Sequence, residues 1–285
     1  GVSVCLAIDG LEDAFQPNPT KGLAEHQQRL LRGLLQGFTS VVREQSSPHL
    51  GVVAFVRRDL AKDAIPQNFG QFEALHSRFT LAWSPTEALR LVAWLLNRAG
   101  LHVIEEDRVP LAPYDELRRG LISFWGANMG SQRSRDAATD RWVIAALSDF
   151  HGRLQARDLV RLVGHAAASV PGKAMLTPAS LREGLVRCSQ KKIDELEREI
   201  RDLQPIFERL RSANDDRRKI PFQASDFNLS PEEVSFLEAQ GVLTRTRQGE
   251  LYLPEIIRHG LGFRMDKGGR AKVLALYRAT QAKQA

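Results

Sequence analysis

The sequence predicts an α/β portion, part of a parallel sheet with helices, followed by a mainly helical region and a C-terminal winged-helix domain. Two short apolar runs, Val2–Ile8 and Leu50–Val56, are typical of buried strands in a parallel sheet, and a long helical pattern separates them. Near the end of the chain, a helical pattern is followed by two short strand patterns, Val242–Thr246 and Glu250–Leu253. A helix that leads into a two-stranded hairpin forms the second half of a winged helix.

The first strand leads directly into an acidic cluster. Its residues are apolar except for one serine and show no alternation, so we expect a strand buried on both faces. Parallel sheets bind ligands at the carboxyl ends of their strands, and Asp9 lies at that end of the first strand. A helical stripe from about Leu23 to Arg43, interrupted by the breakers Gly33 and Gly37, completes a right-handed βαβ unit with the second strand. We therefore expect Asp9 and Arg57 at one sheet edge; a plain helix cap is the alternative role for Asp9.

The middle of the chain shows a series of helical patterns. Ser84 and Pro85 are typical of an N-cap and a first helical residue, and Gly100 ends that helix. Two further helices are expected at about 136–149 and 156–168. From Thr177 to about Arg211 the pattern is again helical, with a very polar centre, so we expect a helix exposed on most sides, as a bridge or a lever. An ordinary solvated helix face is the alternative.

The last folded segment is expected to be a small domain of its own. Ser230 and Pro231 begin its final helix, Gly241 ends that helix, and Gly249 supplies the hairpin turn. Residues 219–227 are expected to supply the first part of the domain. Its predicted core consists of Leu243, Leu251 and Leu253, joined by Phe236 and Leu237.

Composition is that of an ordinary globular protein, with 43% apolar and 26% charged residues. No apolar run approaches the ~20 residues that a membrane helix needs, so we expect no membrane partner. The two cysteines, Cys5 and Cys188, lack metal-ligand spacing, and such sparse use fits a cytoplasmic protein. Because the chain opens within a strand and without Met, we expect it to be the C-terminal part of a longer protein. The net charge of +6 equals the excess in residues 258–285, where seven cations face one acid: Arg258, Arg264, Lys267, Arg270, Lys272, Arg278 and Lys283 against Asp266.

Taken in order, these segments resemble the STAND and AAA+-like P-loop ATPases, particularly bacterial ones with a C-terminal winged helix. The resemblance covers most of the chain, to about residue 262. Val4–Asp9 resembles a Walker B strand, and Val52–Arg57 resembles a sensor-1 strand that ends in an arginine. Phe79–Trp83 resembles the connection into a helical lid, and Gln155–Val160 resembles the start of a lid helix that carries a sensor-2 arginine.

The resemblance implies roles for individual residues. Asp9 would hold the Mg²⁺ of a bound ATP, directly or through water. Arg57 and Arg157 would detect the γ-phosphate and couple its loss to movement of the lid. Relatives often carry an acid after the Walker B aspartate, where this chain has Gly10. Glu12 or Asp13 would replace that acid, or hydrolysis would be slow. The catalytic residues implied are thus Asp9, Glu12 and Arg57. Ordinary surface roles remain the alternative for both arginines.

The resemblance divides the chain into four parts. Residues 1–100 would be the C-terminal part of the P-loop α/β domain, 101–215 a helical lid or bridge, 216–262 the winged helix, and 263–285 a basic tail. The Walker A loop, G-x-x-x-x-G-K-[ST], does not occur in the 285 residues. We therefore expect this chain alone neither to bind ATP tightly nor to hydrolyse it.

Two other functions are consistent with the sequence. A winged helix with a basic tail is a plausible nucleic-acid-binding module, in which Tyr252 and Phe263 would pack or stack and arginines would contact phosphates. The arginines concerned are Arg245, Arg247, Arg258 and Arg264. Winged helices of this ATPase class also serve as lids or protein interfaces. The second alternative is a scaffold without catalytic activity, which binds a partner protein or a second copy of the chain.

Overall fold

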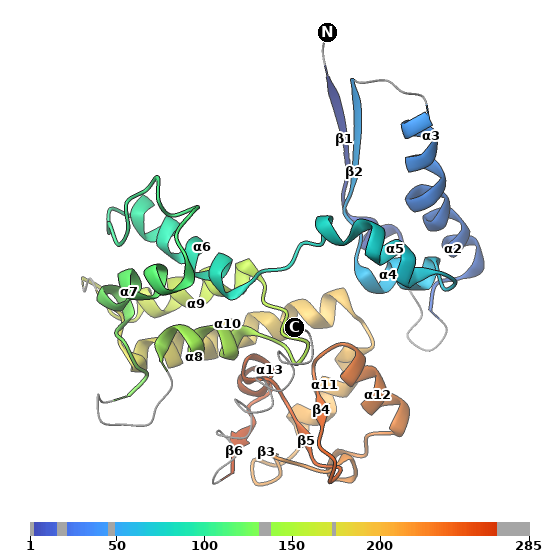
Figure 1. Ribbon diagram of the computed structural model, residues 1–285. Helices are drawn as coiled ribbons and strands as arrows, with labels where there is room; N and C mark the ends of the chain where they lie inside the picture. The colour runs from blue at the N-terminus through green and yellow to red at the C-terminus, as the bar shows by residue number, and fades with distance from the viewer. Residues whose placement is uncertain (1–2, 16–21, 45–48, 131–137, 173–174, 267–285) are drawn as a thin grey trace. The chain divides into compact units, whose positions relative to one another are not determined.

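The computed structural model describes residues 3–15, 22–44, 49–130, 138–172 and 175–266 (Figure 1). The chain forms two compact units, Gly1–Leu81 and Ala82–Ala285. We call them the first unit and the second unit. Most of the predicted basic tail lies outside the described residues.

The first unit is a short parallel sheet with helices. Its elements are β1 (Val4–Ile8), α1 (Leu11–Ala14), α2 (Glu25–Arg32), the π-helical segment η1 (Gly33–Phe38), α3 (Thr39–Glu44), β2 (Leu50–Ala54), α4 (Arg58–Ala64), α5 (Phe69–His76) and the 3₁₀ turn η2 (Ser77–Phe79).

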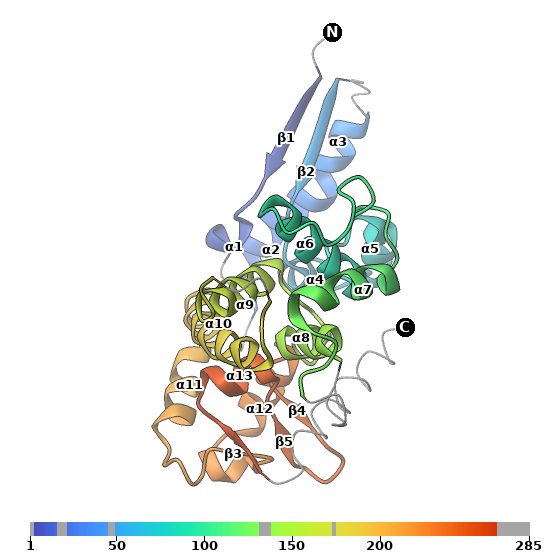
Figure 2. The same ribbon diagram turned by 90° about the vertical axis from the view of Figure 1, so that its left-hand side faces the viewer.

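The pairing of β1 with β2 confirms the predicted βαβ arrangement. The two strands lie side by side (Figure 2) and are parallel. Val4 lies opposite Leu50, and Ile8 lies opposite Ala54. The amide of Phe55 extends the ladder by donating to the carbonyl of Ile8 at 2.8 Å. Because the strands run in the same direction, their carboxyl ends meet at one edge of the sheet, as predicted.

The expectation that these strands are buried on both faces is wrong for the described part of the chain. Val4 is 56% exposed and Val53 is 45% exposed. The apolar core of the unit lies instead among its helices and the ends of its strands, because only there do apolar side chains meet from several directions. This core contains Leu11, Leu23, Leu31, Leu35, Leu60, Ala61, Ala64 and Ile65.

The long helix predicted between the strands is present but irregular. α2 and α3 are joined by the π-helical segment η1, which begins at Gly33 and includes Gly37. Glycine weakens the regular helical hydrogen-bond pattern because it gains backbone freedom when the helix opens. A π-helical segment at these two residues agrees with their prediction as breakers.

The second unit is mainly helical, with short strands near its C-terminal end. Its elements are α6 (Pro85–Arg98), α7 (Tyr114–Trp125), α8 (Thr139–Leu147), α9 (Ala156–Ala168), α10 (Pro178–Glu199), α11 (Leu203–Ser212), β3 (Lys219–Ile220), η3 (Ala224–Phe227), α12 (Pro231–Ala239), β4 (Thr244–Arg245), β5 (Leu251–Tyr252), α13 (Glu255–Gly260) and β6 (Arg264–Met265).

The boundary expected near residue 100 lies earlier, before Ala82. As predicted, Ser84 caps α6: its hydroxyl accepts from the amide of Glu87 at 3.2 Å, and the Glu87 carboxylate accepts from the amide of Ser84 at 2.8 Å. However, Leu89 and other apolar residues of α6 join the core of the second unit. Among the described residues, that core is one cluster with members from Ala88 to Phe263, so the predicted helical and winged-helix parts share one interior.

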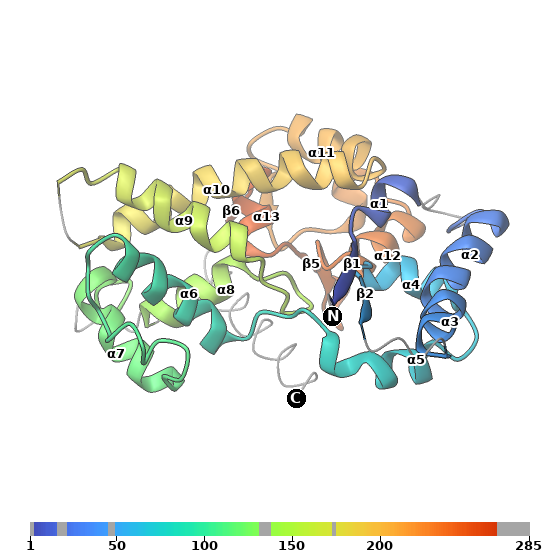
Figure 3. The same ribbon diagram turned by 90° about the horizontal axis from the view of Figure 1, so that it is seen from above.

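The exposed bridge or lever predicted for 177–211 is wrong. The segment divides into α10 and α11, and α10 is a central helix that lies beside α9 and contacts α13 (Figure 3). Leu181, Leu185 and Ile193 are almost completely buried. The polar sequence of α10 predicted an exposed helix. Several of its charged side chains instead form ion pairs with α9.

The C-terminal segment contains the predicted helix and hairpin. The Ser230 hydroxyl caps α12, and β4 and β5 are antiparallel, with Thr244 opposite Tyr252. Phe222 adds a third backbone pairing, by donating to and accepting from Leu251. Four of the five predicted core residues are buried, and Phe236 packs partly buried against them. The assignment of this segment as a winged helix stays a prediction.

Candidate functional site

The predicted phosphate-side residues of the first unit lie where β1 and β2 end. Asp9 follows β1 and is exposed, and its Oδ1 accepts from the amide of Gly10 at 2.9 Å. Gly10 has a φ of +75°, a left-handed conformation that turns the chain sharply into α1. Glu12 lies in the first turn of α1 and is exposed. The turn therefore presents two carboxylates at the edge where parallel sheets bind ligands.

Arg57 stands at the end of β2 but is held by a neighbour. Its guanidinium forms a two-pronged ion pair with Asp59, with Nη2 to Oδ2 at 2.7 Å and Nε to Oδ1 at 3.2 Å. The two side chains are 32% and 44% exposed, so solvent weakens the pair. Arg57 is thus placed at the predicted edge, with an accessible guanidinium that an anionic ligand must share with Asp59 or take from it.

Asp9 fits the role of a single carboxylate ligand for Mg²⁺. Among the residues that the structure describes, no group of three or more His, Cys, Asp or Glu side chains converges to hold a metal by itself. Mg²⁺ usually keeps several waters and is bound through one or two carboxylates together with the phosphates of a nucleotide. One exposed aspartate at a strand end has the donor chemistry that such a shared ion requires.

Arg157 begins α9, as predicted, and is surrounded by acidic side chains of α10. Its Nη2 donates to Glu199 Oε1 at 2.8 Å, and its Nε lies 3.3 Å from Glu195 Oε2. Its Nε also donates to Gln155 Oε1 at 3.0 Å. The Arg157 side chain is 44% exposed, so it remains within reach of a ligand. These carboxylates contribute to a raised pKa for Arg157, against the opposing effect of burial.

Arg157 belongs to a charged cluster that was not predicted from the sequence. Lys192 Nζ donates to Asp158 Oδ2 at 2.9 Å and to Gln155 Oε1 at 2.6 Å. Arg161 pairs with Glu195 and lies 3.8 Å from Asp158 Oδ1. We call this set the α9–α10 charge cluster: Gln155, Arg157, Asp158 and Arg161 of α9 and its cap, with Lys192, Glu195 and Glu199 of α10.

A signal for this cluster was present in the sequence. Lys192, Glu195 and Glu199 are spaced by three and four residues, so they form one stripe on a helix, and Arg157 and Arg161 are four apart. Matching stripes of opposite charge indicate two helices that lie side by side. Only the fold, however, decides which of the chain's many charged stripes face each other.

The cluster lies in a poorly solvated place. Burial disfavours the Glu195 carboxylate, but Arg161 and then Arg157 outweigh that effect and lower its pKa. Burial also raises the pKa of the neighbouring Cys188 thiol to about 12, so this cysteine is a neutral core residue. Asp158 Oδ1, Arg161 Nη1 and Glu195 Oε2 are buried without a hydrogen-bond partner among the described residues, although each lies near an opposite charge. Such a cluster is sensitive to the loss of any one member.

The structure changes the set of residues available to nucleic acid. Arg258 is only 9% exposed; it pairs with Glu255 and donates to the carbonyl of Phe263 at 2.8 Å, so it does not offer its charge to a phosphate. Tyr252 and Phe263 are buried in the core and present no face for base stacking. Tyr252 and Phe263 therefore pack, one of the two roles expected for them, and Arg258 is enclosed by its own partners.

The remaining arginines of that set are on the surface. Arg245 and Arg247 are exposed on the hairpin, and Arg264 is exposed on β6. Arg245 lies 3.4 Å from Glu238, and Arg264 lies 3.3 Å from Asp215. The preceding helix α12 carries Glu232, Glu233 and Glu238. Glu233 pairs with Arg209 and Glu238 with Arg245, whereas the exposed Glu232 repels the phosphate backbone.

Comparisons with models of protein families, with curated proteins and with solved structures gave no match for this chain. Within the described ranges, no helix is both long enough and apolar enough to cross a membrane.

Proposed function

We propose that this chain is the C-terminal half of an ATP-dependent, STAND/AAA+-like P-loop switch or motor. In this proposal, the nucleotide state is coupled to a helical lid and a winged helix in the second unit. The proposal rests on the positions of Asp9 and Arg57. They follow β1 and β2, two paired parallel strands, at the same edge of the sheet. A carboxylate for Mg²⁺ beside a guanidinium for phosphate is the combination that phosphoryl transfer requires, because its catalysis is largely positioning and charge stabilisation.

The proposal gives each residue at this edge of the sheet a separate role. Asp9 would hold Mg²⁺ through its carboxylate, and the ion would neutralise phosphate charge. Arg57 would exchange its ion pair with Asp59 for the terminal phosphate. Glu12, three residues after Asp9, would take the place of the acid that Gly10 lacks and orient the attacking water.

The exposed apolar strands support a larger sheet. Leu6, Val53 and Phe55 are each more than 40% exposed, although apolar side chains of a parallel sheet are ordinarily covered on both faces. In the proposal, β1 and β2 are two strands of a nucleotide-binding sheet whose other strands, and whose phosphate-binding loop, come from elsewhere in the complete gene product. The 285 residues contain no Walker A sequence, so this chain by itself is expected to be inactive.

The connectivity of the C-terminal segment supports the winged-helix part of the proposal. α11, β3, η3 and α12 are followed by the β4–β5 hairpin, and Phe222, just after β3, pairs with β5. A helix, a short strand, two helical segments and a hairpin is the order that a winged helix requires, although β3 itself pairs in parallel with β6. The acidic surface of α12 favours a role as a lid or a protein interface over DNA binding.

The proposal is tested by nucleotide binding and hydrolysis in the complete gene product. We expect Mg²⁺-dependent ATP hydrolysis, and we expect Asp9→Asn to reduce it at least about tenfold because the ion loses its carboxylate ligand. Glu25→Gln, which changes an exposed carboxylate of α2, is the matched control and should leave the rate unchanged. A complete gene product that neither binds nor hydrolyses Mg-ATP would overturn the proposal.

A further inference from the structure

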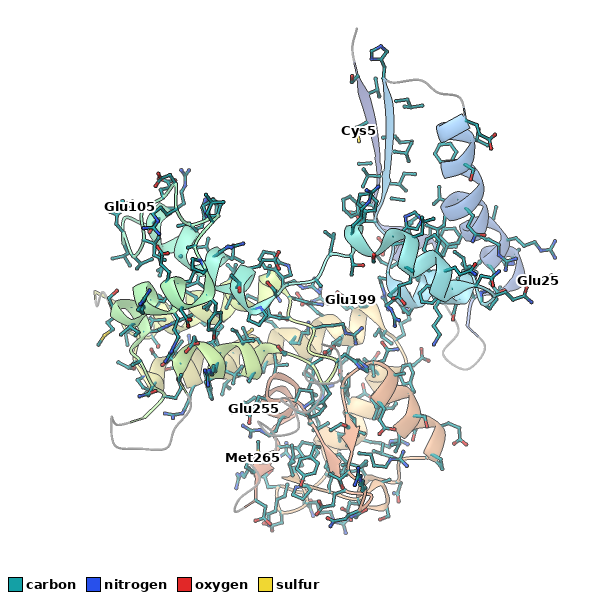
Figure 4. All side chains as sticks on the ribbon, viewed as in Figure 1. Cys5, Glu25, Glu105, Glu199, Glu255 and Met265 are labelled. Carbon is teal, nitrogen blue, oxygen red and sulfur yellow. The ribbon has the colours of Figure 1, made fainter. Side chains whose placement is uncertain are left out.

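A cavity of about 430 Å³ lies in the C-terminal segment of the second unit. It is formed by the stretch after α11, which includes β3, and by η3. Met265 of β6, labelled in Figure 4, lies opposite Ile220 of β3 and marks this end of the unit. Small-molecule sites range from about 300 to about 1,000 Å³, so the cavity has room for a small ligand. Its lining includes Asp216, Arg217, Lys219, Phe222, Ser225 and Asp226.

Three charged side chains of this cavity have no partner within the described part of the chain. Asp216, Arg217 and Lys219 are exposed, and their charged groups form neither an ion pair nor a hydrogen bond with any described residue. The preceding acid, Asp215, is taken up by two other arginines outside the cavity lining. A charged ligand therefore meets these three side chains without first breaking an ion pair.

The charges of the lining balance. Arg217 and Lys219 supply two cations, and Asp216 and Asp226 supply two carboxylates. Asp226 uses Oδ2 to accept from the amide of Gln223 at 2.7 Å, which leaves its second oxygen for a ligand. A simple anion would be repelled by the two carboxylates, and a simple cation by the two cations. A ligand that carries both charges matches the lining.

The cavity also has a fixed apolar wall. Phe222 is buried, and its ring packs edge-on against Phe227, with ring centroids 5.0 Å apart. It also packs against Phe263, with centroids 5.5 Å apart. These contacts hold the ring in place, so the wall is formed before any ligand binds. The ligand that fits this wall has an apolar side chain as well as two charged ends.

We propose that the cavity binds a small zwitterionic peptide, of about the size of a dipeptide. The ligand's carboxylate would pair with Arg217 and Lys219, because a guanidinium matches a carboxylate in shape and charge. Its ammonium group would pair with Asp216 and Asp226, and its apolar side chain would lie on Phe222. The proposal is independent of the nucleotide function, because the cavity lies wholly in the second unit and needs no nucleotide.

The first test uses three forms of one dipeptide, titrated into the full 285-residue chain by isothermal calorimetry. Glycyl-L-leucine keeps both charges, N-acetyl-glycyl-L-leucine lacks the ammonium, and glycyl-L-leucinamide lacks the carboxylate. We expect the dipeptide to bind, and each blocked form to bind at least about fivefold more weakly, because one charged pair is lost at a solvent-accessible site. No binding of the dipeptide, or equal binding of the three forms, would overturn the proposal.

The second test assigns each end of the ligand to its side chains. Lys219→Gln should weaken glycyl-L-leucine about three- to fivefold but leave the amide form unchanged, because that form has no carboxylate to lose. Asp216→Asn should weaken glycyl-L-leucine by a similar factor but leave the N-acetyl form unchanged. Both side chains are exposed, so the fold should be retained, and thermal melts check it.

Arg247→Gln is the matched control for Lys219→Gln. Arg247 is an exposed cation on the β4–β5 hairpin, outside the cavity lining, and its side chain has no partner among the described residues. Its removal should leave the affinity for the dipeptide unchanged. An equal effect of Arg247→Gln and Lys219→Gln would show that only overall charge matters, and the proposal would be wrong. Binding of inorganic phosphate in place of the dipeptide would make the cavity an anion site and would also overturn it.

Discussion

The Asp158 carboxylate and the Lys192 ammonium meet at 2.9 Å between α9 and α10, with side chains only 1% and 11% exposed. Gln155 Oε1 accepts a second hydrogen bond from the same ammonium at 2.6 Å. This pair is the most enclosed part of the α9–α10 charge cluster. It joins the start of α9 to the centre of α10, so it fixes how the two helices align.

Breaking this pair from one side should be strongly destabilising. Lys192→Met leaves the Asp158 carboxylate enclosed without its closest cation, and we expect a loss of about 3–5 kcal/mol in the free energy of unfolding. Urea denaturation followed by circular dichroism measures it. Arg187→Met, which breaks the exposed pair with Glu183, should cost less than about 1 kcal/mol. Equal losses in the two variants would contradict the buried role of Lys192.

The close packing of α10 on α9 makes a second prediction. A Cβ atom on Gly184 would lie 2.7 Å from the carbonyl oxygen of Leu162 and 2.9 Å from the amide nitrogen of Ala166. Gly184→Ala should therefore lower the free energy of unfolding by about 1–3 kcal/mol, because backbone must move. Gly164→Ala is the control: this α9 glycine has open space around it, so alanine should be neutral or stabilise by up to about 1 kcal/mol. Thermal melts of both variants give the comparison.

Acid should weaken the second unit through Glu255 of α13. Burial opposes the charge of this carboxylate, but contacts with His259 and Arg258 lower its pKa from the ordinary 4.5 to about 2. A carboxyl group whose pKa is lower in the folded state stabilises the fold above pH 4.5, and this contribution is lost as the pH falls toward 2.

Glu255→Gln tests this pH dependence. We expect the variant to lose up to about 3 kcal/mol at pH 7 and to show a smaller further loss than the unaltered protein between pH 5 and pH 2. The free energy of unfolding from urea titrations at several pH values is the measurement. Glu105→Gln, at an exposed loop position, should follow the unaltered protein throughout. Parallel curves for Glu255→Gln and the unaltered protein would show that Glu255 does not carry the effect.

The two carboxylates after β1 should differ in their effect on hydrolysis. In the complete gene product, Asp9→Ala should lower Mg²⁺-dependent turnover far more than Glu12→Ala, because Asp9 follows the strand directly and Glu12 only replaces a missing acid. Initial rates at several Mg²⁺ concentrations measure both variants. If Glu12→Ala alone abolished turnover while Asp9→Ala did not, the assigned roles would be reversed.

Any binding of duplex DNA by this chain should depend on its last residues and on salt. Residues 267–285 carry five cations and no acid, whereas Arg258, a member of the predicted phosphate-binding set, is in the core. We expect no binding at about 0.15 M salt and, at most, weak sequence-independent binding at low salt. Fluorescence anisotropy with a labelled duplex compares the full chain with a variant that ends at Asp266. Binding that survives this truncation would instead assign the contact to Arg245, Arg247 or Arg264.

Local patterns predicted the elements that local physics controls. The capped starts of α6 and α12, at Ser84 and Ser230, depend on residues three positions apart, so they are visible in the sequence. The parallel pairing of β1 with β2 followed from two apolar runs joined by a helix, and it placed Asp9 and Arg57 at one edge. The hairpin at Gly249 followed from its turn residues.

The tertiary structure decided what each polar or apolar residue faces. The apolar run of β1 predicted burial, but coverage of a strand depends on neighbours that its own sequence does not specify, and here the strand is exposed. The polar centre of α10 predicted an exposed helix, but Lys192 and Glu195 find opposite charges on α9 and are enclosed. Arg258 carries the same charge as its exposed neighbour Arg264, yet only Arg258 is enclosed, because Glu255 and the Phe263 carbonyl satisfy it inside. A residue's type sets the cost of its burial, whereas the partners that offset this cost come from distant parts of the chain.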